Sequence, residues 1–399
     1  REHYLKVTIP SSMDGNLVKD AEIGEYPTQM VPFYAPKMGA PFDIEEERNQ
    51  PVWVDFYIIP VLASRFFKAV VGGQAYKWAE EVALAAISEA QADGVELTVG
   101  WGALTKLATN HGQLFLEKHP ELNGQQFNST HGDAGTALLV TEGLVRAGVQ
   151  PGCRVAVVGA NGAIGDAASR AITAALQPEN IVLVGKADRP GEKKNLSRLE
   201  ELQQRVKNHV RNGSTEVAIH QDKTSACHSS EVVIVATTGM NLSPKEVPVG
   251  ALVMDMTTPA ACQPDRGWSG HLVLTAGCGE FSPEALPWGF GNIGGSQLQD
   301  VGAGGPRVIW GCTGETIARA VFGWRGHLAG TVIPIDALEW CNNHFKRLGF
   351  VSQPPLNFNN PITWSRVGEF VTASRQWRPM MRLIRRSPPA KEAPIDSGG

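Results

Sequence analysis

From residue 155 onward the sequence alternates short aliphatic runs with segments of helical pattern. Residues 155–158, 181–184 and 232–236 consist of Val, Ile, Leu and Ala, and helix-forming stretches separate them. Short buried runs that alternate with helices are typical of parallel strands joined by crossover helices. The chain is therefore expected to be an α/β protein with a doubly wound, Rossmann-type parallel sheet.

A glycine-rich loop follows the first of these runs at once. Gly159, Gly162 and Gly165 stand between the expected strand and a helix that starts after Gly162. Glycines at such a turn let the backbone approach a pyrophosphate, whose charge the helix N-terminus stabilises. The spacing is GxxGxxG rather than GxGxxG, so the position of the loop in the strand–helix series is the stronger evidence. The residues expected to bind a dinucleotide are Gly159, Asn161, Gly162, Ala163, Ile164 and Gly165, with Thr237 and Thr238 after the fourth strand.

The residues after the second aliphatic run bear on the choice of dinucleotide. An acidic side chain at this point binds the ribose hydroxyls of NAD, whereas a cation accommodates the 2′-phosphate of NADP. Lys186 is closest to the expected strand end and Arg189 follows it, which favours NADPH. Asp188 lies between them and keeps NADH open as the alternative.

One cysteine, Cys312, has the context of a nucleophile. It precedes Thr313-Gly-Glu315, a sequence typical of a helix start, where the helix dipole lowers a thiol pKa below its free value of about 8.5. Most cysteines are small buried apolar residues, and Cys153, Cys262 and Cys278 are competitors near expected strand ends. The six cysteines form no CxxC pair and no zinc-site spacing. Reduced thiols, no metal site and a cytoplasmic location are expected.

The remaining segments differ in composition and in the spacing of their apolar residues. Residues 1–50 are rich in Pro, Gly and acidic side chains and are expected to form an irregular lead-in. Apolar residues recur at helical spacing within residues 51–150, which indicates a mainly helical or mixed domain on the substrate side. Residues 151–310 form the expected Rossmann domain, residues 311–386 a C-terminal helical region starting at the nucleophile, and residues 387–399 a disordered tail.

Charge and hydropathy limit the partners. A net charge of −4 argues against a chain-wide nucleic-acid surface. No apolar run reaches the roughly 20 residues of a membrane span, and no secretory signal is expected at the start. A basic segment beside apolar residues could meet an acidic carrier protein or lipid headgroups, or it could cover the core as an end helix. Its arginines are Arg375, Arg378, Arg382, Arg385 and Arg386.

Five stretches between about Tyr57 and Trp324 resemble the long-chain acyl-[acyl-carrier-protein] reductases, which are NADPH-dependent and form fatty aldehydes. They are residues 59–68, 100–105, 128–131 and 155–165, and the run from Trp310-Gly-Cys312 to Gly323-Trp324. The sequence before residue 50 and the glycine-rich stretch 289–305 depart from the family pattern.

The resemblance implies covalent catalysis. Cys312 carries over as the nucleophile that takes the acyl group from an acyl-carrier-protein or coenzyme A thioester, before NADPH reduces the acyl enzyme. His131 is the implied proton donor, and Thr105 is a weaker candidate for the acyl pocket with a helix-capping role as its alternative. Two other functions stay open. One is an NADP-dependent alcohol or ketone dehydrogenase without covalent catalysis, and the other is a non-catalytic NADP(H)-binding sensor or scaffold.

Overall fold

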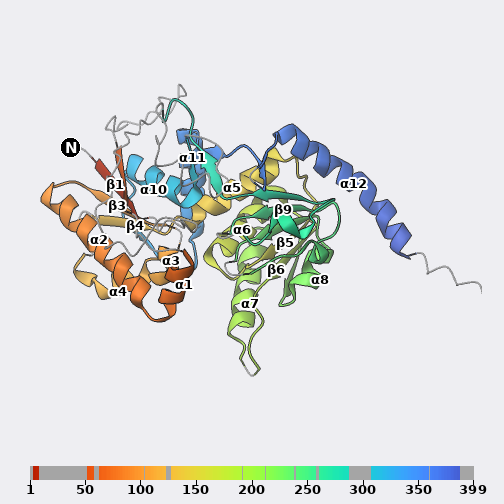
Figure 1. The fold of residues 1–399 in the computed structure, drawn as a ribbon, viewed down its shortest axis with the longest axis horizontal. Coiled ribbons are helices and arrows are strands. Elements are labelled where there is room, and N and C mark those ends of the chain that lie inside the picture. Colours follow the sequence, from red (N-terminus) through yellow and green to blue (C-terminus); the bar gives the residue numbers. More distant parts are fainter. Residues whose placement is uncertain are drawn as a thin grey trace, which may run out of the picture.

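The computed structural model describes most of the chain after residue 62. The described residues are 3–8, 52–57, 63–102, 104–122, 127–190, 192–211, 213–237, 240–257, 260–286, 307–358 and 360–386. Most of the expected lead-in, Thr238, the glycine-rich stretch 289–305 and the tail 387–399 lie outside them. Two parallel sheets with helices around them make up the described part (Figure 1).

The larger sheet has the strand order of a dinucleotide-binding fold. Its strands are β5 (Arg154–Val158), β6 (Asn180–Val184), β7 (Glu216–His220), β8 (Val232–Val235), β9 (Leu252–Asp255), β10 (Leu272–Thr275), β15 (Leu356–Asn357) and β16 (Asn360–Pro361). The parallel strands run β10-β9-β8-β5-β6-β7, with β15 and β16 added antiparallel beside β10. This is the 3-2-1-4-5-6 order of doubly wound sheets. The expected doubly wound parallel sheet is confirmed.

Both faces of this sheet are covered, which explains its continuous aliphatic runs. Val155 and Val157 lie in a core shared with α5 (Asp133–Arg146), α6 (Ala163–Leu176) and α7 (Lys194–Lys207). The alternate residues Ala156 and Val158 lie in a second core with α8 (Lys223–His228). Successive strand side chains point to opposite faces, so a strand covered on both sides is apolar at every position.

The N-terminal part contains a second parallel sheet, so of the two expectations, mainly helical or mixed, the structure has the mixed one. The sheet order is β13-β4-β3-β1-β2, and all its neighbouring pairs are parallel. The strands are β1 (His3–Thr8), β2 (Val52–Tyr57), β3 (Leu97–Trp101), β4 (Phe127–Thr130) and β13 (His327–Leu328). Strand β1 also falls within the segment expected to be irregular.

The helices expected from the spacing of apolar residues are present and pack on this sheet. They are α1 (Ala63–Val71) and α2 (Gln74–Ala92), separated at Gly72-Gly73, and they are followed by α3 (Thr105–Ala108) and α4 (Gln113–Lys118). The sequence did not predict β3 and β4, because these strands are buried but carry Thr, Gly, Asn and Ser. Such strands lack the aliphatic signal of β5 or β8.

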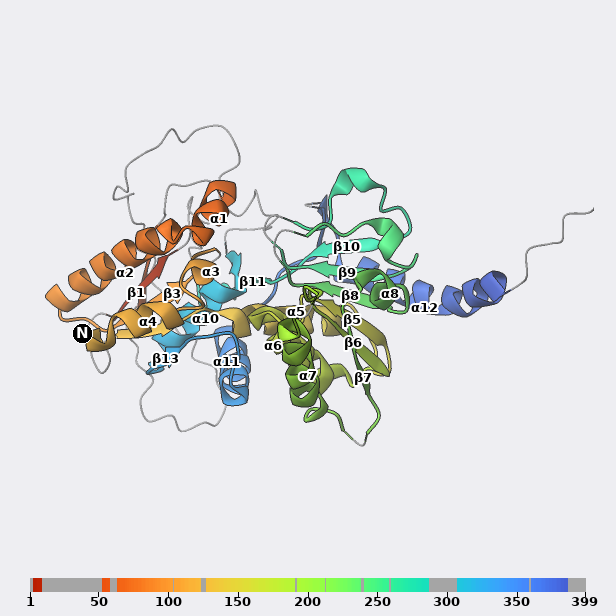
Figure 2. The same cartoon turned by 90° about the horizontal axis from the view of Figure 1, so that it is seen from below.

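The C-terminal segments connect the two sheets. Helix α10 (Gly311–Val321) packs on α5 and β3, and Figure 2 shows α5 and α10 between the sheets. A small antiparallel sheet of β11 (Cys278–Glu280), β12 (Val308–Trp310) and β14 (Val351–Ser352) leads into α10. Helix α11 (Ile335–Leu348) covers α10, and α12 (Trp364–Arg386) runs away from the larger sheet (Figure 1). Among the described residues, no helix combines the length and the apolar character needed to cross a bilayer.

Candidate active site

The glycine loop lies at the centre of the larger sheet, where its strand order reverses. Gly159 has a φ of 87°, and a Cβ atom there would lie 2.7 Å from the carbonyl oxygen of Ala236. A Cβ atom on Gly165 would overlap the carbonyl oxygen of Gly159, so this glycine lets α6 pack against the loop. Gly162 is different: its Cβ position meets only the Gly159 carbonyl oxygen, at 3.4 Å. Gly162 is exposed, and beyond this contact its Cβ position faces open space.

The start of α6 is uncapped by any side chain. Gly162 occupies the N-cap position with extended backbone, and within the described part of the chain no side chain bonds the first N–H groups of the helix. These donors can therefore bind a phosphate. The other predicted loop residues surround this turn: Asn161 and Ile164 are half-buried, Ala163 is buried, and Thr237 lies against Gly159.

Asp188, the candidate for binding the ribose of NADH, bonds to the backbone of α7 instead. The Asp188 carboxylate accepts hydrogen bonds from the backbone N–H groups of Asn195 and Leu196, at 2.7 and 2.9 Å. These bonds cap the first turn of α7. Lys186 and Arg189, which flank Asp188, are exposed. The segment after β6 thus exposes Lys186 and Arg189 to solvent, whereas the Asp188 carboxylate caps α7.

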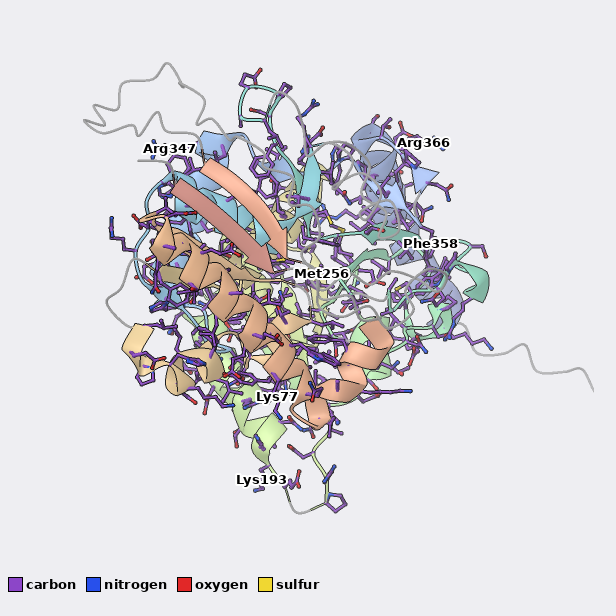
Figure 3. All side chains as sticks on the ribbon, turned by 60° about the vertical axis from the view of Figure 1, so that its left-hand side comes forward. Lys77, Lys193, Met256, Arg347, Phe358 and Arg366 are labelled. Carbon is purple, nitrogen blue, oxygen red and sulfur yellow. The ribbon has the colours of Figure 1, made fainter. Side chains whose placement is uncertain are left out.

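Cys312 is the second residue of α10, as the sequence predicted for a thiol at a helix start. Its side chain is 8% exposed. The N–H of Gly311 donates to the carbonyl oxygen of Gly277 at 2.8 Å, just beyond the end of β10. Met256 lies against Gly277 at the end of β9, near the middle of the molecule in Figure 3. This bond holds the start of α10 at the carboxyl edge of the larger sheet, the edge at which doubly wound sheets bind their ligands.

The other five cysteines are buried more deeply, each with 2% exposure or less. Burial raises the pKa of Cys227 and Cys278 to about 12, and it also raises the pKa of Cys262 and Cys341. Cys153 lies in the core beneath β5. These surroundings are those of structural thiols, and they distinguish Cys312 from its competitors.

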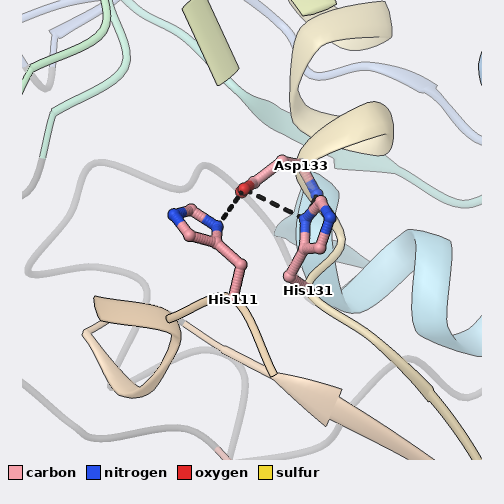
Figure 4. Close-up of side chains that lie close together, drawn as sticks. All are labelled: His111, His131 and Asp133. Carbon is pink, nitrogen blue, oxygen red and sulfur yellow. Dashed lines mark hydrogen bonds and ion pairs between the residues drawn. The ribbon is translucent and has the colours of Figure 1, made fainter. Parts of the chain in front are cut away.

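Four polar side chains gather where β3 and β4 end. Asp133, the first residue of α5, is completely buried at their centre. Its Oδ1 atom accepts a hydrogen bond from Lys106 Nζ at 2.5 Å. Its Oδ2 atom lies 2.9 Å from His111 Nδ1 and 3.0 Å from His131 Nδ1, and Figure 4 shows the two rings on either side of the carboxylate. We refer to Lys106, His111, His131 and Asp133 as the ionic cluster.

The ionic cluster adjoins Cys312 through Gly132. This residue lies between His131 and Asp133 with a φ of 70°, and a Cβ atom on it would lie 2.5 Å from Cys312 Cβ. Any larger side chain would push α10 away from the cluster. Glycine is therefore required here both for the backbone conformation and for the close approach of Cys312.

The charges of the cluster stabilise one another. Burial opposes ionisation of Asp133, but Lys106 and His131, together with hydrogen bonds from both histidines, hold its pKa well below the usual range. Burial also opposes the charge of Lys106, yet Asp133, Cys312 and Glu315 raise its pKa above the usual value. Lys106 and Asp133 are therefore both ionised at neutral pH.

His131 has one free nitrogen. Its Nδ1 atom faces the Asp133 carboxylate, whereas its Nε2 atom is buried and has no hydrogen-bond partner among the described residues. A buried polar atom without a partner is costly unless a ligand completes it. An imidazole oriented by a carboxylate at one nitrogen and open at the other is suited to move a proton.

A second buried ion pair holds α10 in place. The Glu315 carboxylate accepts hydrogen bonds from Thr130 Oγ1, the N–H of Gly135 and Arg319 Nε, each at 2.8 Å. These donors come from β4, α5 and α10 itself. The helix that carries Cys312 is thereby bonded to the elements that carry the ionic cluster.

The cluster also has the composition of a metal site, because ligand atoms of His111, His131 and Asp133 all lie within 4.8 Å of one another. However, the Lys106 ammonium group already contacts the same carboxylate and would repel a divalent cation. We therefore interpret the group as an ionic network.

Sequence reasoning identified His131 but missed Lys106, His111 and Asp133. Asp133 comes soon after β4, whereas Lys106 lies on α3 and His111 after it, and this placement could be used only once β3 and β4 were recognised. Thr105, predicted for the acyl pocket or as a cap, is the first residue of α3 and fully buried. Its hydroxyl donates to the carbonyl oxygen of Gly102 at 2.6 Å, and no side chain caps this helix.

No protein-family model and no curated protein matches the chain. Among solved structures, an oxidoreductase/dehydrogenase of unknown specificity from Escherichia coli is 20% identical, with 35% of this chain and 40% of that chain covered at a TM-score of 0.27. The chain thus spans about two fifths of that protein's length. A quinate dehydrogenase from Corynebacterium glutamicum in complex with NAD is 13% identical over 93% of this chain and 99% of that chain, with a TM-score of 0.33. Similarities this weak assign no function, so any functional conclusion must rest on the residues of this chain.

Proposed function

We propose that the protein reduces an acyl thioester to an aldehyde with NADPH, through an acyl group held on Cys312. The observation that carries the proposal is the position of this thiol. It lies at the start of α10, beside the ionic cluster, and its helix is bonded to the end of β10. A nucleophile, groups that can move protons and the dinucleotide edge of the sheet meet at one place, as a covalent reduction requires.

NADPH is the cofactor that the residues fit. The open face of Gly162 and the uncapped start of α6 would hold its pyrophosphate. Lys186 and Arg189 would bind the 2′-phosphate, because Asp188 is used to cap α7. When bound, the cofactor supplies the hydride that reduces the acyl group.

The residues around the thiol have separate tasks in this proposal. The Cys312 thiolate attacks the thioester carbonyl; a bond from Sγ to the acyl carbon forms as the bond to the carrier sulfur breaks. His131 Nε2 gives a proton to the departing carrier thiolate. Backbone N–H groups in the first turn of α10 stabilise the oxygen of each tetrahedral species. After reduction the tetrahedral oxyanion collapses to the aldehyde and expels Cys312 as thiolate, and His131 recovers from solvent the proton that it gave to the carrier thiol.

The acyl donor is proposed to be an acyl-carrier-protein or coenzyme A thioester. Helix α12 projects from the body of the molecule and carries the basic segment (Figure 1). A projecting basic helix offers a surface for an acidic carrier protein.

Intact-protein mass spectrometry tests the covalent step. Without NADPH, mixing with short and long acyl thioesters should add the mass of one acyl group, which peptide mapping assigns to Cys312. Adding NADPH should then discharge the enzyme and release one aldehyde for each NADPH oxidised. Aldehyde formation with no acyl adduct, or an adduct on another residue, would contradict the proposal.

The Lys106–Asp133 pair favours a second candidate, the direct dehydrogenase. A buried lysine next to the cofactor edge could exchange the hydroxyl proton of an alcohol as the hydride moves, without any thioester. Cys312 would then be dispensable for turnover, whereas the thioester mechanism cannot proceed without it.

A further inference from the structure

We propose that Lys106, held in place by Asp133, is the fixed cation that makes Cys312 a reactive thiolate near neutral pH and then stabilises oxyanions on its acyl group. The second part of this role rests on the proposed function. The first part concerns the free protein and can be tested without any acyl substrate.

Lys106 brings a buried positive charge into the junction that Cys312 adjoins. Lys106 follows β3 on α3, is 8% exposed, and bonds Asp133, whose neighbour Gly132 packs on Cys312. Lysine is almost never buried unless its charge is paired or used. In a buried site of low dielectric constant, this charge acts on Cys312 far more strongly than it would in water.

Among the residues that the structure describes, the other charges around Cys312 leave Lys106 as the cation available to it. On α10, Glu315 and Arg319 pair with each other at 2.8 Å. On β11 and α11, Cys278 and Cys341 have raised pKa values because they are buried, so they are neutral thiols.

The remaining charged groups all meet at Asp133. This single carboxylate faces three donors, Lys106, His111 and His131, and only one positive charge is needed to neutralise it. Without Lys106, Asp133 would be an opposing negative charge beside the thiol.

Alkylation by iodoacetamide measures the thiolate directly, because only that form reacts. Modification of Cys312 is followed by peptide mass spectrometry across pH in the wild type, Lys106→Met, Lys106→Arg and the control Lys223→Met. Lys223, the first residue of α8, forms an ion pair with Glu246 at 3.0 Å, so the control removes a lysine–glutamate pair elsewhere in the molecule. Lys106→Met should slow alkylation at pH 7 about tenfold or more and raise the pH midpoint by about one unit or more. Lys106→Arg should preserve most of the reactivity, and Lys223→Met should change neither quantity.

A second variant guards against misfolding, because Lys106→Met leaves Asp133 buried without its main partner. The double variant Lys106→Met/Asp133→Asn removes both charges, and thermal unfolding and NADPH binding report whether each protein is folded. A folded Lys106→Met or double variant with the wild-type pH midpoint would overturn the role of Lys106. A chelator should leave the wild-type rate unchanged, and a rate that falls on metal removal would also overturn it.

The two proposals fail in different ways. Rapid, Lys106-dependent alkylation with no acyl adduct from any thioester would disprove the reductase and support the Lys106 assignment. An acyl adduct on Cys312 with a pH midpoint that ignores Lys106 would support the reductase and disprove the assignment.

Discussion

The two parallel sheets present different chemistry at their carboxyl ends. In the larger sheet, β5 ends at Val158, and the groups beyond it belong to the backbone: the tight loop at Gly159 and the N–H groups at the start of α6. In the smaller sheet, β3 and β4 are followed by buried side chains, Lys106 and the pair His131 and Asp133. Backbone groups suit the recognition of a pyrophosphate, whereas side chains supply charge and protons.

Solvent exposure differs between the two ends as well. Lys186 and Arg189 at the larger sheet are exposed, so salt and water weaken their interactions. Lys106 and Asp133 at the smaller sheet are buried, so their charges act strongly on Cys312. Substitutions in the two regions should therefore affect different steps and differ in size.

The largest effect is expected for Cys312→Ala, which removes the nucleophile. Aldehyde formation should fall by more than about 10³-fold, and the acyl adduct should disappear. NADPH affinity, measured by fluorescence titration, should stay close to that of the wild type. Cys278→Ala is the matched control, because it removes a thiol on the neighbouring strand. Substantial turnover in Cys312→Ala would instead favour the direct dehydrogenase.

Gly162→Ala should have the opposite effect: it should weaken NADPH binding and leave the reaction at Cys312 intact. The added methyl group fits against the Gly159 carbonyl oxygen but narrows the approach to α6, so NADPH affinity should fall about tenfold or more. Acyl-adduct formation on Cys312, measured by intact mass, should be unaffected. Gly165→Ala is the contrasting variant: its methyl group overlaps the Gly159 carbonyl oxygen, and it should lower thermal stability. Parallel loss of NADPH binding and acylation in a stable Gly162→Ala protein would mean that the regions are not separable.

Lys186→Ala should have a smaller effect, limited to the choice of cofactor. Loss of an exposed contact to the 2′-phosphate should weaken NADPH binding about tenfold and leave NADH binding nearly unchanged. Lys193→Ala, at the N-cap of α7, is the control for a general loss of positive charge. A wild-type protein that prefers NADH would contradict the assignment, as would equal weakening of both cofactors.

The smallest effect is expected on α12. Replacing three of its arginines with glutamine should lower the second-order rate with acyl-carrier-protein substrates a few-fold, because charge on such a surface mainly steers association. The loss should be greater at low ionic strength and absent with acyl-coenzyme A. Equal loss with both donors would assign the segment to the fold, and no loss would place carrier docking elsewhere.

The local sequence was sufficient to predict the larger sheet and the glycine loop that follows β5. The strands of the larger sheet are aliphatic because both their faces are buried, and the glycines follow β5 within one turn. The helix start at Cys312 was equally legible from the residues beside it. These features depend on interactions between residues that are close in the chain, so their patterns are visible without the fold.

Only the tertiary structure decided how the groups of the candidate site come together. Lys106 and Asp133 follow two different strands, β3 and β4, which could not be predicted because they carry polar residues. Cys312 is far from both in the sequence and comes close to Gly132 only in the folded chain. Asp188, the alternative that the sequence offered for ribose binding, caps the first turn of α7 instead. A short motif fixes which groups a residue can offer. Which groups face one another across a buried junction depends on the packing of distant segments, and the sequence carries no local pattern for it.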